Sequence, residues 1–190
     1  MIDRHCQNYD DQQLVALSLK DSRYFYCLMR RYEEKLSRYL RRFTYLTDDD
    51  IADVIEDSFI NVYQHLNDFD PGLKFSSWIY RIVHNQAINF IKKSKGSLKV
   101  DLDKGNDEFV NWLVDDTNIE KETLIKEQNE HISSLLSQLK PDYKEVLVLK
   151  FFEDKDYQEI SDILQKPMGT VATLISRAKI QFKKIYEKEK

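Results

Sequence analysis

The chain has 190 residues, enough for one large domain or two small ones, and its 29 basic and 33 acidic side chains give a net charge of −4. Four glycines and three prolines are too few for the many tight turns of a β-sandwich or β-barrel, so the composition favours long helices. The acidic balance argues against a nucleic-acid-binding protein, because such proteins usually carry a basic excess.

Export, membrane insertion and metal binding are not indicated. No run approaches the roughly 18 apolar residues of a membrane span, so no direct membrane insertion is expected. The amino end has neither the apolar core nor the cleavage signal of an export leader, which predicts a cytoplasmic protein with Cys6 and Cys27 as free thiols. Two cysteines and four dispersed histidines lack metal-ligand spacing, so we expect no metal site and no other cofactor.

The first half of the chain, residues 9–93, shows nearly continuous helical periodicity. Asp10 with Gln13 and Thr47 with Asp50 have the spacing of capping boxes that begin helices. A turn is predicted over 67–72, followed by a helix from about Ser77 to Lys93 that Ser76 or Ser77 would cap. These elements predict a first helical domain over residues 1–93.

The remainder of the chain divides into an acidic linker and a second helical segment. Residues 94–128 hold five basic and nine acidic side chains with little periodicity, which indicates a flexible linker. Residues 129–190 are helical again, with a helix that ends before Pro141 and a capping box formed by Asp156 and Glu159. The predicted fold class is therefore all-α, with two small helical domains joined by a flexible linker.

The pattern near the carboxyl end is typical of a helix-turn-helix. A short helix over 157–164 precedes a break and a long last helix, whose apolar stripe runs from Val171 to Ile185. Seven basic and two acidic residues follow Leu164, an excess that can neutralise phosphates. A helical hairpin with a solvated basic face is the alternative.

The helix predicted from about Ser77 carries an unusual second stripe. It consists of Trp78, Ile82, Asn85, Asn89 and Lys92. Amides recognise base edges, aromatic rings stack on unpaired bases and lysines bind phosphates, so the stripe as a whole indicates nucleic-acid contact. Trp78 taken alone favours a core anchor instead.

The acidic helix start at Asp48–Asp57 has three interpretations. Acidic side chains stabilise a helix amino end. Residues 49–53 also match the DDxxD pattern with which terpenoid synthases hold magnesium and diphosphate, although the chain is short for that fold and lacks a second such motif. The third interpretation is a polar stripe that docks a basic partner, formed by Asp53, Glu56, Asp57 and Asn61.

Together these segments resemble the sigma-seventy family of bacterial RNA polymerase sigma factors, most closely the extracytoplasmic-function (ECF) group. The resemblance spans about 9–93 and 129–186. It rests on four segments: residues 53–63; 69–71 followed by 75–85; 139–147; and 157–164 followed by 169–171 and 176–179.

The resemblance implies a non-enzymatic protein with two DNA-recognising domains. The first would bind core RNA polymerase and recognise and melt the promoter −10 element, and the second would read the −35 element; an anti-sigma factor is an expected partner. For the −10 element the resemblance implies Lys74, Phe75, Arg81, Asn85, Asn89, Lys92 and Lys93, and the polar stripe adds Trp78. For the −35 element it implies Thr170, Thr173, Ser176 and Arg177, and the basic excess after Leu164 adds Lys179 and Lys184. Polymerase would bind Asp53, Glu56, Asp57 and Asn61.

Two departures from the family pattern stand out. The recognition helix reads Val171-Ala172-Thr173-Leu174 where the family often has Val-Lys-Ser-Arg, so two groove-facing cations are missing. Glu56 stands where the family often has Gln. The alternatives are a helix-turn-helix regulator whose amino-terminal bundle serves dimerisation or sensing and, third, a magnesium-dependent diphosphate enzyme of the DDxxD type.

Overall fold

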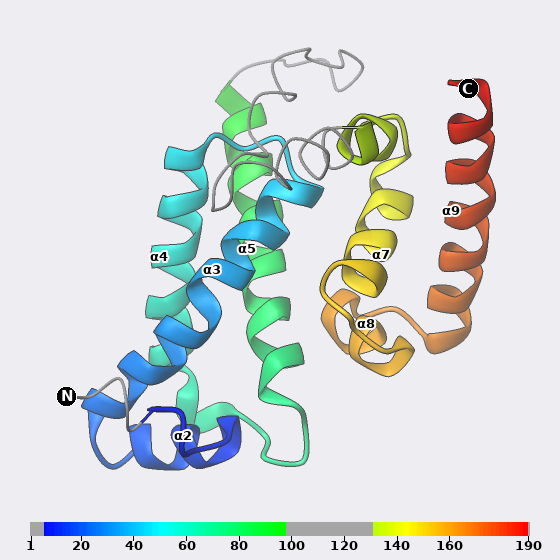
Figure 1. Ribbon diagram of the computed structural model, residues 1–190. Coiled ribbons are helices and arrows are strands. Elements are labelled where there is room, and N and C mark those ends of the chain that lie inside the picture. Colours follow the sequence, from blue (N-terminus) through cyan, green and yellow to red (C-terminus); the bar gives the residue numbers. More distant parts are fainter. Residues whose placement is uncertain (1–5, 98–130, 190) are drawn as a thin grey trace, which may run out of the picture.

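The computed structural model describes residues 6–97 and 131–189, and within them every regular element is a helix (Figure 1). This confirms the all-α prediction. None of the described helices is long and apolar enough to span a bilayer. The predicted linker lies outside the described residues from residue 98 onward.

Residues 6–97 form the first bundle, in which the long helices α3, α4 and α5 pack side by side while short α2 lies across one end (Figure 1). Its elements are α2 (Asp11–Ser18), the 3₁₀ turn η1 (Ser22–Tyr24), α3 (Phe25–Phe43), α4 (Asp48–Gln64), η2 (Leu66–Asp68) and α5 (Phe75–Ser97). Both predicted capping boxes are present, at Asp10 with Gln13 and at Thr47 with Asp50. These caps satisfy amide groups that the first turn of a helix leaves without partners.

Helix α5 begins two residues earlier than predicted and continues past Lys93. The backbone N–H of Gly72 donates to Asp70 Oδ1 at 2.8 Å, and this tight turn leads directly into the helix. Neither Ser76 nor Ser77, the two predicted caps, precedes the helix. Ser77 is buried within the first turns, and Ser76 Oγ donates to Glu159. The start is set instead by burial of Phe75, the first residue of α5.

An aromatic cluster joins the turn before α5 to the core. The Phe69 ring lies 5.5 Å from the Phe75 ring and 5.3 Å from the Trp78 ring, centroid to centroid, and Tyr32 lies 5.6 Å from Phe75. Aromatic side chains bury large apolar areas, and offset or edge-on pairs add further stabilisation. The cluster thus holds the 69–75 turn against α3 and α5.

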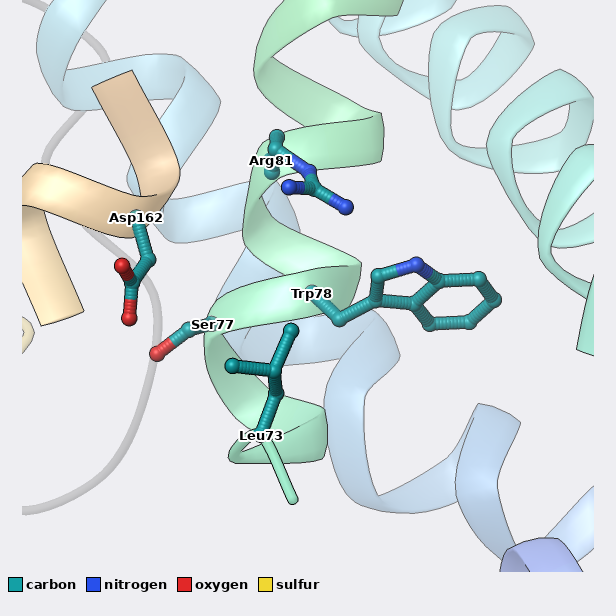
Figure 2. Close-up of a pocket in the computed structure, with 5 residues that line it drawn as sticks. All are labelled: Leu73, Ser77, Trp78, Arg81 and Asp162. Carbon is teal, nitrogen blue, oxygen red and sulfur yellow. The ribbon is translucent and has the colours of Figure 1, made fainter. Parts of the chain in front are cut away.

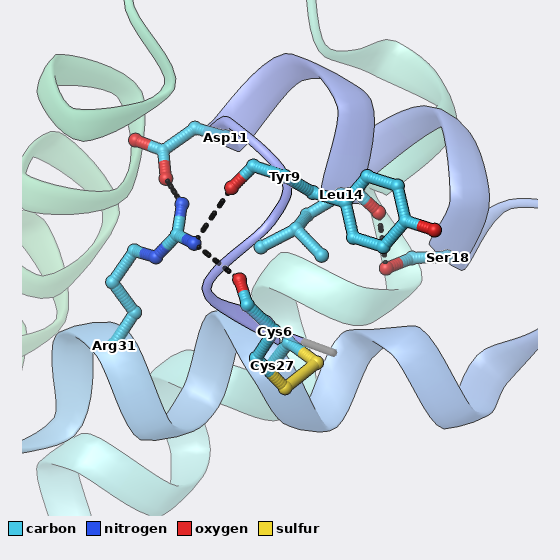
Figure 3. Close-up of a disulfide and its surroundings, with 7 residues drawn as sticks. All are labelled: Cys6, Tyr9, Asp11, Leu14, Ser18, Cys27 and Arg31. Carbon is cyan, nitrogen blue, oxygen red and sulfur yellow. Dashed lines mark hydrogen bonds and ion pairs between the residues drawn. A yellow bond between two sulfur atoms is a disulfide. The ribbon is translucent and has the colours of Figure 1, made fainter. Parts of the chain in front are cut away.

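The two cysteines form a disulfide, so the expectation of free thiols is wrong (Figure 3). The Cα atoms of Cys6 and Cys27 lie 5.3 Å apart, within the usual range for a disulfide. Arg31 holds the same segment: its guanidinium pairs with Asp11 at 2.6 Å and donates to the backbone oxygens of Cys6 and Tyr9. The expectation failed because it rested on compartment and spacing, and neither shows that the amino-terminal segment folds back onto α3.

Residues 131–189 form the second bundle. Residues 131–137 are helical and are followed by α7 (Pro141–Phe151), α8 (Tyr157–Leu164) and α9 (Met168–Lys188). The capping box of Asp156 with Glu159 is confirmed, and Gln165 ends α8 in the left-handed conformation with φ of 52°. Val171, Ile175 and Ala178 are buried along α9, as the predicted stripe requires. The pair α8–α9 is a helix-turn-helix.

The two bundles pack directly against each other. Helix α7 contacts α3, and α8 contacts α5, so that buried residues of both bundles form one continuous hydrophobic core (Figure 1). Sequence periodicity predicted the helices of each bundle but contained no sign of this contact.

Candidate nucleic-acid and polymerase interface

The acidic stripe on α4 is exposed to solvent. Asp53, Glu56 and Asp57 are exposed and Asn61 is half-buried, while the opposite face of the helix is buried in the core. Gln86 from α5 donates to Asp57 at 3.4 Å, which links the stripe to the neighbouring helix. The structure therefore brings all four predicted polymerase-binding residues onto one accessible face.

Structural roles account for much of the acidic start of α4. Asp50 completes the capping box with Thr47, and Asp48 pairs with Arg41 at 3.0 Å. The described residues contain no cluster of three or more side chains suited to a metal ion. The DDxxD interpretation thus finds no support in the geometry.

The later part of α5 presents the predicted polar stripe. Asn85, Asn89, Lys92 and Lys93 are exposed, and the opposite face of the helix is buried. The amides and ammonium groups thus project from a rigid, well-packed support. Such a row can meet base edges and phosphates without a change in the backbone.

The start of α5 differs from this prediction. Phe75 and Trp78 are only 1% and 7% exposed and pack into the aromatic cluster with Phe69. Neither ring can stack on an unpaired base without leaving the core. Both side chains instead lie in the core and support the turn before α5, which agrees with the interpretation of Trp78 as a core anchor.

Lys74 is exposed but is engaged by the second bundle. Its Nζ lies 3.1 Å from Asp156 Oδ2 and 3.4 Å from Glu159 Oε2. The hydrogen bond to Asp156 and the charge of Glu159 raise the pKa of Lys74 above its usual value. The pKa of Asp156 is lowered, first by the backbone N–H of Glu159 and further by Lys74.

Arg81 of α5 is half-buried and lines a small cavity between the two bundles (Figure 2). With Leu73, Ser77, Trp78 and Asp162 it lines a cavity of about 10 Å³, close to the lower limit for one water molecule. Asp162 comes from α8, so this small space lies at the junction of the bundles.

The predicted −35 residues lie on α9, but not all on one face. All six are exposed, and Thr173 Oγ1 donates to the Gly169 carbonyl oxygen at 2.8 Å. Lys179 lies apart from the others, with its Nζ 5.7 Å from the centre of the Phe151 ring. It stands beside Lys183 at an apolar groove of about 720 Å³ formed by residues 131–137, α7 and α9.

Comparison with known proteins identifies the family. Residues 28–96 match the model of sigma-70 region 2, and residues 130–182 match that of sigma-70 region 4. The chain is 31% identical over 174 residues to the ECF RNA polymerase sigma-E factor of Haemophilus influenzae, covering 89% of this chain and 91% of that protein. The chain belongs to the ECF group of sigma-70 factors. The ECF sigma factor SigW of Bacillus subtilis is 31% identical over 70% of this chain and 73% of its own length.

Solved structures share the fold of this ECF sigma factor. CnrH, determined in complex with the cytosolic domain of CnrY, aligns with a TM-score of 0.69 at 22% identity, over 95% of this chain and 99% of that chain. RpoE of Bartonella quintana, determined with the anti-sigma factor NepR, gives a TM-score of 0.68 at 15% identity, over 86% and 96% of the two chains. The first bundle thus corresponds to region 2 and the second to region 4.

Sequence reasoning missed the polar residues by which region 4 holds region 2 in this sigma factor. Four carboxylates on α7, α8 and the loop between them contact the first bundle; we call Glu145, Glu153, Asp156 and Glu159 the interdomain carboxylates. Their partners in the first bundle lie more than 60 positions away in the chain, so no local spacing reveals them. In the sequence, Glu159 was recognised only as the third residue of the capping box with Asp156. The structure contains that capping box in addition to the interdomain contact of Glu159.

Proposed function

We propose that this ECF sigma factor binds core RNA polymerase through the acidic face of α4 and opens the promoter −10 element with the later part of α5. The observation that carries the proposal is the exposed row of Asn85, Asn89 and Lys92 above a buried helix face. Unstacking a base costs a few kcal/mol, which contacts with the extruded base must offset. Two amides and neighbouring lysines on a rigid helix suit that task.

The −10 contact is divided between reading and supporting residues. Asn85 and Asn89 would recognise unpaired bases, while Lys92, Lys93 and Arg81 would attract the phosphate backbone. Lys74 would contact the strand at the turn before α5. Phe75 and Trp78 would not contact the DNA. Both are buried in the core, where they hold the turn before α5 in place.

Region 4 would bind the −35 element through the exposed face of α9. Thr170, Thr173, Ser176 and Arg177 are accessible there, and Lys184 adds positive charge further along the helix. With Ala172 and Leu174 in place of cations, most of the binding energy at this element would come from phosphate contacts. Lys179, at the apolar groove, would contribute little to it.

The proposal includes the setting in which the protein works. It would act in the cytoplasm on core polymerase and catalyse no reaction of its own. An anti-sigma factor would regulate it, in keeping with the solved relative that was determined bound to one.

The test is reconstitution of transcription. The full chain is mixed with core polymerase and a library of promoter sequences, and new start sites are mapped. We expect co-purification with core and initiation at sites that core alone does not use. If the chain neither co-purifies with core nor directs initiation, the proposal fails.

A further inference from the structure

Thr173 lies at the centre of the exposed face of α9. Thr170 precedes it by three positions and Arg177 follows it by four, spacings that place side chains on the same face of a helix. All three residues are exposed. The buried residues of α9 lie on the opposite side of the helix and are Val171, Ile175 and Ala178. A molecule that contacts this face from outside therefore meets Thr173 first.

The hydroxyl of Thr173 is engaged within the helix itself. Its Oγ1 donates to the Gly169 carbonyl oxygen at 2.8 Å. A threonine hydroxyl has a single proton, so this side chain has no further hydrogen bond to donate. The other group of the side chain is its γ-methyl group. Thr173 therefore offers an outside partner an apolar contact, although threonine is classed as a polar residue.

The space beside Thr173 is open toward the start of α9. Gly169 lies one helical turn before Thr173, and a Cβ atom built on it would meet no heavy atom within 4 Å. None of the glycines that the structure describes has a positive φ, so the backbone does not require glycine at this position. Glycine within a helix is less favourable than alanine, and it is common where a ligand approaches the backbone closely. Gly169 thus leaves room for a partner to reach the Thr173 methyl group.

Arg177 places a cation on the same face. It forms no ion pair within the part of the chain that the structure describes. In the major groove, arginine bonds O6 and N7 of guanine, whereas an apolar group contacts the methyl group of thymine. Four residues of an α-helix span about 6 Å, or about two base-pair steps. Thr173 and Arg177 therefore fit a thymine and a guanine that lie within about two base pairs of each other.

We propose that Thr173 determines specificity by recognising the 5-methyl group of a thymine in the −35 element through its own methyl group. The proposal rests on the function assigned above to α9. Phosphate contacts supply binding energy there but carry no sequence information, so the choice of sequence must come from base contacts. The contact between methyl groups selects thymine over cytosine, which lacks the 5-methyl group, and Arg177 selects the neighbouring guanine.

The test removes one methyl group at a time from each side of the contact. Holoenzyme is formed from core polymerase and the full-length chain, with the promoter that the library assay selects most strongly. Each thymine of its −35 element is replaced in turn by deoxyuridine, which lacks only the 5-methyl group. A binding titration measures the affinity of the holoenzyme for each template, and a transcription assay measures initiation.

Three variants of the chain are compared on these templates. Thr173→Ser removes the methyl group and keeps the hydroxyl, whereas Thr173→Val keeps a methyl group and removes the hydroxyl. Thr47→Ser is the matched control, because it makes the same change at an exposed residue of region 2 and keeps the oxygen that caps α4. Circular dichroism should show the same helical content in all of them.

For the natural chain we expect deoxyuridine at one thymine to weaken binding about three- to fivefold, the value of burying one methyl group. At that position Thr173→Ser should bind the thymine and deoxyuridine templates equally, with the affinity that the natural chain has for deoxyuridine. Thr173→Val and Thr47→Ser should discriminate between the two templates as the natural chain does.

Four results would overturn the contact between methyl groups. The selected −35 element contains no thymine, deoxyuridine has no effect at any position, Thr173→Ser keeps the full discrimination, or Thr173→Val loses it. The last result would assign recognition to the hydroxyl oxygen as an acceptor. Failure of the proposed function gives a different pattern: the holoenzyme initiates on no template, whichever of the two bases it carries.

Discussion

The two parts of α5 share one helix and one proposed task but differ in their surroundings. From Asn85 to Lys93 the polar face is open to solvent. At the start, Phe75 and Trp78 are core residues and Lys74 is held by carboxylates of region 4. A helical repeat predicts which side chains share a face, but it does not show whether another domain covers that face. The start of α5 is therefore a structural junction, and its later part is the accessible surface that we propose contacts the promoter.

Loss of the Phe75 ring should have the largest effect, and it should act on stability. Phe75→Ala removes the centre of the aromatic cluster, and such changes cost about 3–5 kcal/mol in the free energy of unfolding. Urea denaturation measures the loss. Leu73→Ala, on a neighbouring exposed side chain, is the control and should cost less than about 1 kcal/mol. A Phe75→Ala variant of natural stability would show that the cluster does not support the turn.

Reduction of the disulfide tests whether the amino-terminal segment and α2 stabilise the turn before α5. Gln12 Nε2 donates to the Pro71 carbonyl oxygen at 2.8 Å, and the bond between Cys6 and Cys27 ties the segment before α2 to α3. Closing a loop with a sequence separation of 21 stabilises a protein by about 3 kcal/mol in the chain-entropy model. Urea denaturation with and without dithiothreitol should show a loss of about 2–3 kcal/mol.

The reduced chain should still keep its amino-terminal segment in place. Arg31 continues to bind Asp11 and two backbone oxygens when the sulfur atoms are separated. A Cys6→Ser, Cys27→Ser double variant should not respond to reductant. Equal stability of the natural chain in both redox conditions would mean that the disulfide contributes nothing to the fold.

Asn85→Ala tests the accessible part of α5 and should affect function without affecting stability. Loss of an amide that contacts a base costs about 1–3 kcal/mol in binding, so we expect roughly tenfold slower opening of a duplex promoter. A promoter with a pre-melted bubble should show a smaller defect, because the strands are already separated. Fluorescence of a base analogue in the −10 element follows opening, and Asn67→Ala provides an exposed control outside the surface. Equal losses on both templates would contradict a melting role.

The sequence predicted local structure well because local rules govern it. The capping boxes of Asp10, Thr47 and Asp156 begin α2, α4 and α8 in the structure. The contacts of Lys74 and Cys6 were not predictable, because each depends on how elements distant in sequence meet. Net charge misled for a different reason: residues 94–128 hold five basic and nine acidic side chains, which account for the whole net charge of −4, so the rest of the chain is neutral.

Lys144 lies under the contact between the bundles and gives the smallest expected effect. Burial lowers its pKa to about 8, while the Tyr45 ring of region 2, 4.3 Å from Nζ, favours the charged form. One pKa unit corresponds to about 1.4 kcal/mol. The lowering of the Lys144 pKa therefore means that burial of the charged ammonium destabilises the folded state by at most about 3 kcal/mol. With the contribution of Tyr45 subtracted, we expect Lys144→Met to stabilise the protein by about 1 kcal/mol at pH 7.

The sign of the pH dependence distinguishes this explanation from simple repacking. Below pH 8 the lysine is charged in both the folded and the unfolded state, and the folded state bears the full cost of burial. Between pH 8 and 10.5 the folded state releases the proton first, so the natural chain gains stability as pH rises. The advantage of Lys144→Met should therefore shrink between pH 7 and 9.5 in paired urea titrations. The tyrosines with raised pKa are common to both chains, so their effect cancels in the difference. An advantage that stays constant with pH would assign the gain to apolar packing under Tyr45 and not to the buried charge.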